Sequence, residues 1–407
     1  MIPKNKNTTL SSWATLGALG IATIVIELGC GVEQKESPEG ETRDAFVGTL
    51  EDAWVVVDLQ LVQTETVLTD LHAAIDALVD DSMNDATRTT AQEAWTAAMT
   101  EWQKMEVMKM GAVGDSLKVN GGQDLGYEIY SWPQSNRCLV DQRTARRDFD
   151  ASDFFEQENV LGNSYGLDAL EILLFSPNYT HDCPTQLAAH IELWDTLGES
   201  GVAQARADYS LRIIDQILSD VEQIRSDWET SYGTSLAQAG QDGSIFETDV
   251  EGLNAIFDAL FYMEVQVKDK KLGWPLGLTS CGQADCTGKI ESRLAGGSHL
   301  WLAANLAGFR SLYTGNDNDE VIGMHNFLVS LSDEGSQLAD DVMTNLESAE
   351  AAVAGLEYPL DETLEVDSGT LAGVHAAIKG VTDLLKNDFP EVIEGLKVPL
   401  EASGDND

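Results

Sequence analysis

The chain has few basic residues. It contains 24 lysines and arginines against 69 aspartates and glutamates, so its formal net charge is -45 over 407 residues. Nucleic acids and anionic lipid headgroups are bound through clusters of basic side chains. The composition therefore predicts no nucleic-acid partner. Most of the acids are expected to form a solvated surface that attracts cations without specificity.

Histidine and cysteine are also scarce, and neither forms a metal or catalytic motif. The six histidines stand in separate segments, and the five cysteines include no CxxC pair. A zinc site of ordinary spacing and a zinc-peptidase helix are therefore not predicted. A Gly-x-Ser-x-Gly turn and a phosphate-binding loop are missing as well.

The first 30 residues are typical of a secretory signal. Lys4 and Lys6 precede a mostly apolar stretch over residues 10–28, which ends at Gly29 and Cys30. A small residue directly before a cysteine resembles a lipoprotein signal, in which Cys30 would carry the lipid. Glu27 stands where such signals usually have leucine, so a cleaved signal without lipid and an uncleaved anchor stay open.

The body of the protein is therefore expected outside the cytoplasm, in the periplasm or at the cell surface. An outer-membrane lipoprotein held by an N-terminal lipid anchor is the predicted form. The polar residues 31–45 are typical of a flexible tether. In an oxidising compartment the four remaining cysteines are expected to pair, Cys138 with Cys183 and Cys281 with Cys286.

Apolar residues recur at helical spacing along the rest of the chain, and no useful strand-period segment occurs. The longest expected helices are 46–79, 85–110, 202–232, 246–272, 289–313 and 321–356. A Gly- and Ser-rich stretch, 233–244, marks a predicted boundary between an N-terminal half, 46–235, and a C-terminal half, 245–400. The fold class predicted is all-α, with two antiparallel helical bundles.

Two acids inside an apolar helix are the main functional signal. Residues 165–175 are predicted to form a buried helix, yet Asp168 and Glu171 project from one side of it. A buried carboxylate must find a cation, find hydrogen-bond donors or take up a proton. A lysine or arginine from another helix, a half-buried helix with both acids in water, and a bound cation or polar ligand are the three explanations.

The order of short motifs resembles the imelysin family of extracytoplasmic helical proteins. That family has a Trp-rich early helix, an Ile-x-x-Trp-Pro loop, a Gly-x-His-x-x-Glu helix and a late helix with Asn-x-x-Gly. The corresponding residues here are Trp95, Trp102, Glu106 and Lys109; Ile129, Trp132 and Pro133; Gly166, Asp168 and Glu171; Glu291, Ser292, Arg293, Ser298, Asn305, Gly308 and Tyr313.

The resemblance implies two four-helix bundles related by a pseudo-twofold axis, with a site in the cleft between them. It also implies a link to metal uptake, chiefly of iron. A partner transport protein is a further expectation. The family histidine is Asp168 here. An Asp-x-x-Glu pair offers only oxygen ligands, which favours harder cations such as calcium, manganese or ferric iron.

Asp168 and Glu171 are therefore the predicted central metal ligands, and Glu106 and Glu291 are candidate further ligands. Lys109 and Arg293 are candidate charge partners, and an Arg293–Glu171 salt bridge would close the pair. Ser298, His299 and Trp132 complete the candidate site. A surface binding or adhesion module without metal is the first alternative. A metallopeptidase is the second, although these motifs do not support that family label.

Overall fold

The computed structural model describes residues 41–157, 160–284, 286–315 and 321–399, and these belong to one compact unit. The predicted signal, Cys30 and most of the predicted tether lie outside the described residues. Helix α1 begins at Glu41, so the last tether positions are helical. Within the described ranges, no helix is both long and apolar enough to span a membrane.

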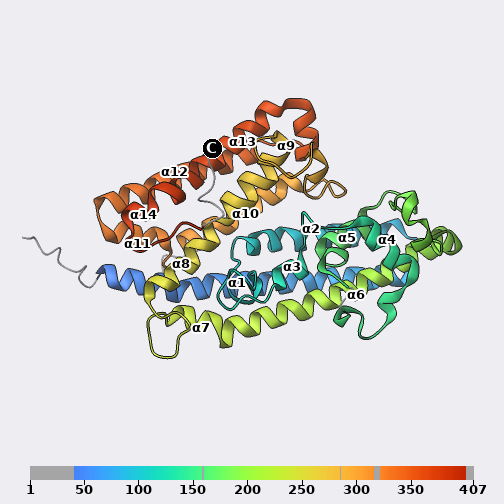
Figure 1. Ribbon diagram of the computed structural model, residues 1–407, viewed down its shortest axis with the longest axis horizontal. Coiled ribbons are helices and arrows are strands. Elements are labelled where there is room, and N and C mark those ends of the chain that lie inside the picture. The colour runs from blue at the N-terminus through green and yellow to red at the C-terminus, as the bar shows by residue number, and fades with distance from the viewer. Residues whose placement is uncertain (1–40, 158–159, 285, 316–320, 400–407) are drawn as a thin grey trace, which may run out of the picture. The chain divides into compact units, whose positions relative to one another are not determined.

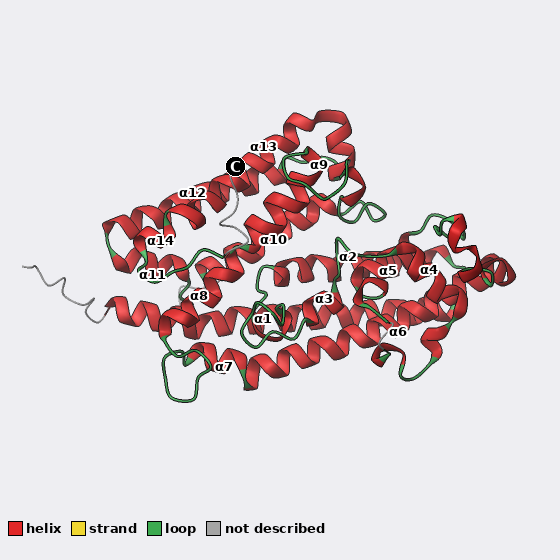
Figure 2. Cartoon of the chain, viewed as in Figure 1, coloured by secondary structure: helices red, strands yellow, loops and turns green. Residues whose placement is uncertain are grey.

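Every regular element of the described residues is a helix (Figure 2), which confirms the predicted fold class. The helices are α1 (Glu41–Asp80), α2 (Asp85–Glu106), α3 (Leu125–Ile129), α4 (Arg137–Arg146), α5 (Leu167–Phe175), α6 (Trp194–Thr230), α7 (Tyr232–Ala237), α8 (Asp249–Leu260), η6 (Met263–Gly273), α9 (Trp274–Leu276), α10 (Ser298–Thr314), α11 (Met324–Leu331), α12 (Asp333–Ala354), α13 (Leu360–Asn387) and α14 (Phe389–Val392). Short 3₁₀ helices are η1 (Gly111–Val113), η2 (Asp148–Asp150), η3 (Phe154–Glu156), η4 (Gly162–Ser164), η5 (Thr185–His190) and η7 (Thr287–Lys289).

The early helices pack around a row of large apolar side chains. Helix α1 lies along α2 and α6 (Figure 1), and α2 also contacts α5 and α10. The Trp and Met stripe of α2 is fully buried at Trp95, Met99, Trp102 and Met105, as a core stripe should be. Because α2 touches both early and late helices, its buried face positions residues from both halves of the chain.

The later helices form a second packed group, in which α12 contacts α11 and α13. The buried apolar side chains of the early and late helices belong to one continuous cluster, and Trp95 meets Trp301 edge to face at 5.9 Å. Contacts of α10 with α2 and of α11 with α1 join the two groups. The division at residues 233–244 stays a prediction.

Three predicted helices differ from the observed ones. The predicted helix 246–272 consists of α8 and a separate π-helix, η6. The predicted helix 321–356 is broken at Ser332, whose extended backbone ends α11 and whose hydroxyl caps α12 by accepting the Gly335 N–H at 3.1 Å. Serine competes for backbone hydrogen bonds in this way at helix starts.

The third difference concerns the predicted helix 289–313, which begins only at Ser298. Residues 291–296 form a turn instead, with positive φ at Ser292 (49°) and Gly296 (68°). Consecutive glycines, Gly296 and Gly297, disfavour the helix here. Both predicted disulfides are present, Cys138–Cys183 and Cys281–Cys286.

Candidate functional site

Helix α5 is held on the buried face of α2. The indole N–H of Trp95 donates to the carbonyl of Leu167 at 2.8 Å, and the Gln92 amide donates to the carbonyl of Leu174 at 2.9 Å. Gly166, just before the helix, has φ +94°, and a Cβ there would lie 2.8 Å from the Ile129 carbonyl oxygen. The glycine therefore allows α5 to approach the loop that carries Tyr130, Ser131 and Trp132.

The acids of α5 are buried, with exposed fractions of 4% for Asp168 and 8% for Glu171. This burial rules out the half-buried explanation. Among the described residues, neither carboxylate forms an ion pair with a lysine or arginine. Arg293 instead pairs with Asp361 at 3.5 Å on the surface, so it does not close the acid pair.

Asp168 lies in the first turn of α5. Its Oδ2 accepts a hydrogen bond from the hydroxyl of Ser131 at 2.6 Å, whereas Oδ1 is buried without a hydrogen-bond partner. Burial raises the pKa of Asp168 to about 6, against the opposing effect of the Ser131 hydrogen bond. The side chain is therefore mostly ionised at neutral pH, and its Oδ1 faces no hydrogen-bond donor.

Glu171 is held by backbone amides. Its Oε1 accepts hydrogen bonds from the N–H groups of Leu294 at 3.0 Å and Ala295 at 2.9 Å, in the turn before α10. Burial raises the pKa of Glu171 to about 7, the two amides lower it, and the neighbouring charge of Asp168 raises it. The turn that replaces the predicted helix thus supplies the donors that the sequence analysis could not identify.

Glu291 belongs to a second buried network, centred on Lys271. The Lys271 ammonium lies 2.6 Å from Gln103 Oε1, 2.9 Å from Asn305 Oδ1 and 2.9 Å from Glu291 Oε2. Glu291 Oε1 accepts from Gln103 Nε2 at 3.0 Å and from the Tyr130 hydroxyl at 2.8 Å. Burial lowers the pKa of Lys271, and the charge of Glu291 opposes that shift.

Glu106 also has a cation beside it. Lys109 Nζ lies 2.9 Å from Glu106 Oε1, and the Tyr262 hydroxyl donates to Oε2 at 2.8 Å. Burial and the adjoining acids hold the pKa values of Tyr130 and Tyr262 well above their usual range, so both act as donors. Two of the four predicted ligands, Glu106 and Glu291, are therefore paired with lysines, and Asp168 and Glu171 are not.

The remaining predicted site residues make contacts of other kinds. The Ser298 hydroxyl accepts the Leu360 N–H at 2.9 Å, and half-buried His299, whose pKa is lowered by burial, leaves Nδ1 unbonded. Trp132 donates from its indole to the carbonyl of Lys289 at 3.2 Å. Within the described ranges, no group of three or more histidines, cysteines or acids is arranged to hold a metal ion.

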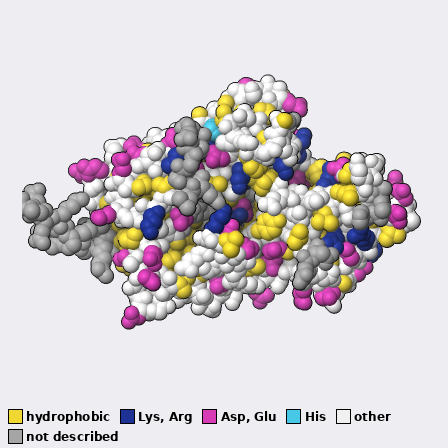
Figure 3. All heavy atoms as spheres, in the orientation of Figure 1, with side chains coloured by type: hydrophobic (Ala, Val, Ile, Leu, Met, Phe, Trp, Pro, Cys, Tyr) yellow, Lys and Arg dark blue, Asp and Glu magenta, His cyan; other side chains and the backbone are white. Residues whose placement is uncertain are grey.

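A cavity of about 920 Å³ adjoins this region, and its wall includes Glu106, Lys109, Tyr130, Ser131, Trp132 and Tyr262. Asp168 and Glu171 are not in the wall, but Ser131 both lines the cavity and donates to Asp168. In the face shown in Figure 3, lysine and arginine side chains lie beside hydrophobic ones in the middle of the molecule. Asp168 is therefore separated from the cavity by the hydroxyl of Ser131.

Lys271 and Gln103 are not among the predicted site residues, and Asn305 is predicted only as part of the Asn-x-x-Gly motif. The sequence signal is weak, since Glu264 and Lys271 stand in a segment with several other charged residues, unlike the apolar surroundings of Asp168 and Glu171. Glu264 and Lys268, both fully buried, pair at 3.2 Å within η6.

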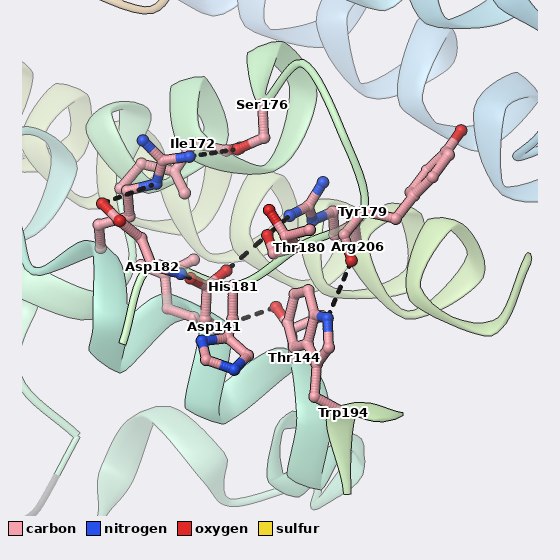
Figure 4. Close-up of polar contacts among 12 residues, drawn as sticks. Asp141, Thr144, Ile172, Ser176, Tyr179, Thr180, His181, Asp182, Trp194 and Arg206 are labelled. Atoms are coloured by element: carbon pink, nitrogen blue, oxygen red, sulfur yellow. Dashed lines mark hydrogen bonds and ion pairs between the residues drawn. The ribbon is translucent and has the colours of Figure 1, made fainter. Parts of the chain in front are cut away.

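A further polar cluster lies at the disulfide Cys138–Cys183 and has a structural role. Figure 4 shows the guanidinium of Arg206 beside Asp141 and Thr180. Arg206 donates to the carbonyls of Asn178 at 2.7 Å and Thr180 at 3.2 Å, and Asp141 accepts the Asp182 N–H at 2.7 Å. These bonds fix the loop after α5, because they satisfy its backbone groups.

Comparison with known proteins agrees with this architecture. Two similar solved structures are a "putative iron-regulated protein A precursor" from Parabacteroides distasonis ATCC 8503 and an imelysin-like protein from Psychrobacter arcticum 273-4. The first is 16% identical with a TM-score of 0.66, covering 86% of this chain and 95% of its own. The second is 17% identical with a TM-score of 0.64, covering 89% and 99%.

No curated protein matches the chain. The family model described as Imelysin matches residues 60–387, a span that contains α5, the turn before α10 and the Lys271 network. Since that match covers most of the sequence and the helical fold agrees with it, the chain belongs to the imelysin family.

Proposed function

We propose that this imelysin-family protein works outside the cytoplasm, where it binds a cation or a cation-bearing ligand beside the buried acids of α5. The single observation that carries the proposal is a pair of buried carboxylates, Asp168 and Glu171, with no lysine or arginine paired to them in the described residues. An incoming cation would stabilise both charges, to which the protein offers only neutral hydroxyl and amide donors.

The oxygen ligands favour a hard cation, because carboxylate and hydroxyl oxygens bind manganese, calcium or ferric iron more readily than they bind soft metal ions. Asp168 Oδ1 is the oxygen with no partner of its own. Glu106 and Glu291 would join only if Lys109 or Lys271 moved away. One of the similar structures is named as iron-regulated, which agrees with a role of this chain in metal traffic.

Isothermal titration calorimetry with manganese chloride and calcium chloride at pH 7.5 tests the proposal. The wild type is compared with the double variant Asp168→Asn, Glu171→Gln. Asp220→Asn is the matched control, because Asp220 is also buried and its pKa is also raised to about 6 by burial. We expect saturable binding to the wild type and the control, weakened about tenfold or more in the double variant.

Equal, weak and unsaturable binding by all three proteins would remove the proposal, because it would assign the ions to the acidic surface. A crystal soaked in a manganese salt gives an independent check. An anomalous peak between Asp168 and Glu171 supports the site, and peaks confined to surface carboxylates contradict it. The periplasmic or surface location is tested by fractionating cells that express the full chain.

A further inference from the structure

Ion pairs within the wall of the cavity leave its acids in excess. Five acids and three lysines line the space of about 920 Å³. Lys109 pairs with Glu106 at 2.9 Å, and Lys118 pairs with Asp115 at 3.7 Å. With both pairs set aside, three acids and one lysine remain. The cavity therefore favours a cationic ligand over an anionic one.

The three remaining acids differ in how far the protein already bonds them. Asp124 accepts hydrogen bonds from the hydroxyl and the backbone N–H of Ser116, and these bonds lower its pKa. Glu251 uses Oε2 to accept the Glu247 N–H at 2.8 Å. Asp258 forms no hydrogen bond or ion pair within the described ranges. Glu251 and Asp258 are both exposed, so they are the carboxylates that a ligand can reach.

Asp258 stands beside aromatic side chains in this concave wall. It keeps contact with solvent, yet the surrounding protein desolvates it and raises its pKa to about 6, against the opposing charge of Lys397. Burial and the charge of Asp258 raise the pKa of Tyr232, a wall residue that is 1% exposed and whose hydroxyl has no hydrogen-bond partner. Tyr232 meets Phe246, also in the wall, edge to face at 5.5 Å. Carboxylates, unbonded hydroxyl oxygens and ring faces all attract an ammonium group.

The two accessible acids lie on one face of α8. Glu251, Ala255 and Asp258 stand at positions i, i+4 and i+7, and all three line the cavity. Seven residues of an α-helix rise about 10.5 Å along its axis. The wall therefore presents two carboxylates about two helical turns apart, with a methyl group between them. This pattern matches a chain of methylene groups that carries an ammonium group near each end.

We propose that the cavity binds a linear polyamine, with one ammonium end at Asp258, the other at Glu251 and the methylene chain over Ala255. The volume of the cavity is within the range of about 300 to 1,000 Å³ that holds small organic molecules. The two acids select a ligand with two charges, because a monoamine reaches only one of them. The site does not include Asp168 or Glu171, so this inference is independent of the proposed function.

Isothermal titration calorimetry with spermidine tests the inference, at pH 7.5 and about 150 mM salt, which screens separated surface charges. Butylamine, which has a single amino group, is titrated separately. The double variant Glu251→Gln, Asp258→Asn removes both charges of the site. Asp340→Asn, Glu347→Gln is the matched control, because these acids are also exposed and seven positions apart, on α12 and outside the cavity wall. Circular dichroism and the thermal midpoint check that each variant is folded.

We expect saturable spermidine binding by the wild type and the control, weakened at least about tenfold in the α8 double variant, because two charge-assisted contacts are lost. Butylamine should bind the wild type at least about tenfold more weakly than spermidine does, since it makes one such contact. Ala255→Trp should also weaken spermidine binding, because its ring fills the space between the two acids.

Equal affinity of the wild type and the α8 double variant for spermidine would overturn the inference. Equal weakening in the α12 control would also overturn it, because the binding would then belong to the acidic surface as a whole. Butylamine that binds as tightly as spermidine would overturn the two-ended site.

The double variant Asp168→Asn, Glu171→Gln separates this inference from the proposed function. It should bind spermidine as the wild type does. If it loses spermidine while the α8 double variant retains it, the amine binds at the acid pair and the inference is overturned. If manganese chloride does not bind to the wild type while spermidine binding depends on the α8 acids, the proposed function fails and this inference stands.

Discussion

The clearest test of the buried acid pair is the pH dependence of stability in Glu171→Gln. Burial raises the pKa of Glu171 from 4.5 to about 7. A carboxyl group whose pKa is higher in the folded chain than in the unfolded chain binds its proton more tightly when folded. This favours folding, and the full effect is present when the pH is below 4.5, the pKa in the unfolded chain. That advantage is lost as the pH rises through about 7. At about 1.4 kcal/mol per pKa unit, the ionised group costs the folded state about 3 kcal/mol at high pH.

About 2.5 kcal/mol of this cost should develop between pH 5 and pH 8, from the two pKa values and proton linkage. Glutamine cannot ionise, and its carbonyl oxygen can still accept the N–H groups of Leu294 and Ala295. The variant should therefore gain about 2.5 kcal/mol relative to the wild type between the two pH values. The other titrating groups are shared by both proteins and largely cancel in the comparison.

Urea unfolding followed by tryptophan fluorescence at pH 5 and pH 8 measures the difference. Asp220→Asn, in another buried region, should show the same trend because the pKa of Asp220 is also raised, and it checks that the method detects such shifts. The two effects should add, because the sites share no partner. A stability difference between Glu171→Gln and wild type that is the same at both pH values would refute the reasoning. It would mean that Glu171 is not desolvated.

Two other predictions concern the groups that hold the site. Lys271→Met should lower the free energy of unfolding by about 3 to 5 kcal/mol, because Glu291 stays buried without its cation. Adding Glu291→Gln should recover part of this loss in the same urea assay. If the losses of the two single variants simply add in the double variant, the pairing is contradicted. Replacing Cys138 and Cys183 by serine should lower the free energy of unfolding by about 4 kcal/mol, because this disulfide closes a loop of 45 positions. Replacing the other pair should lower it by about 2 kcal/mol, because that loop spans 5 positions. Urea unfolding measures both losses, and equal losses would mean that loop length is not the cause.

Much of the architecture follows from the spacing of apolar residues. The helical class, the buried stripe of α2, the burial of α5 and both disulfide pairs agree with prediction. These features depend on local periodicity and on the cysteine count, which are visible in one chain. Helix ends were less predictable, since Ser332 and the glycines before Ser298 break stretches whose apolar spacing continues through them.

The partners of the site residues could not be predicted, because they come from distant parts of the chain. Glu171 is bound by backbone amides, which have no sequence signature, and more than a hundred positions separate it from Leu294. Lys271 reaches Glu291 from η6, a π-helix that apolar spacing does not distinguish from an α-helix. Side-chain type identified the acids, but only the fold identifies which of them already has a cation.

The wide turns of η6 make this segment more sensitive to a change in length than to a change in side chain. A π-helix spaces its side chains differently from an α-helix, and here it turns both Lys268 and Lys271 into the interior. Loss of one residue would rotate every later side chain to a different side of the helix axis. Lys271 would then face away from Glu291. Descendants of this gene should therefore accept exchanges along Met263–Gly273 far more readily than single-codon deletions.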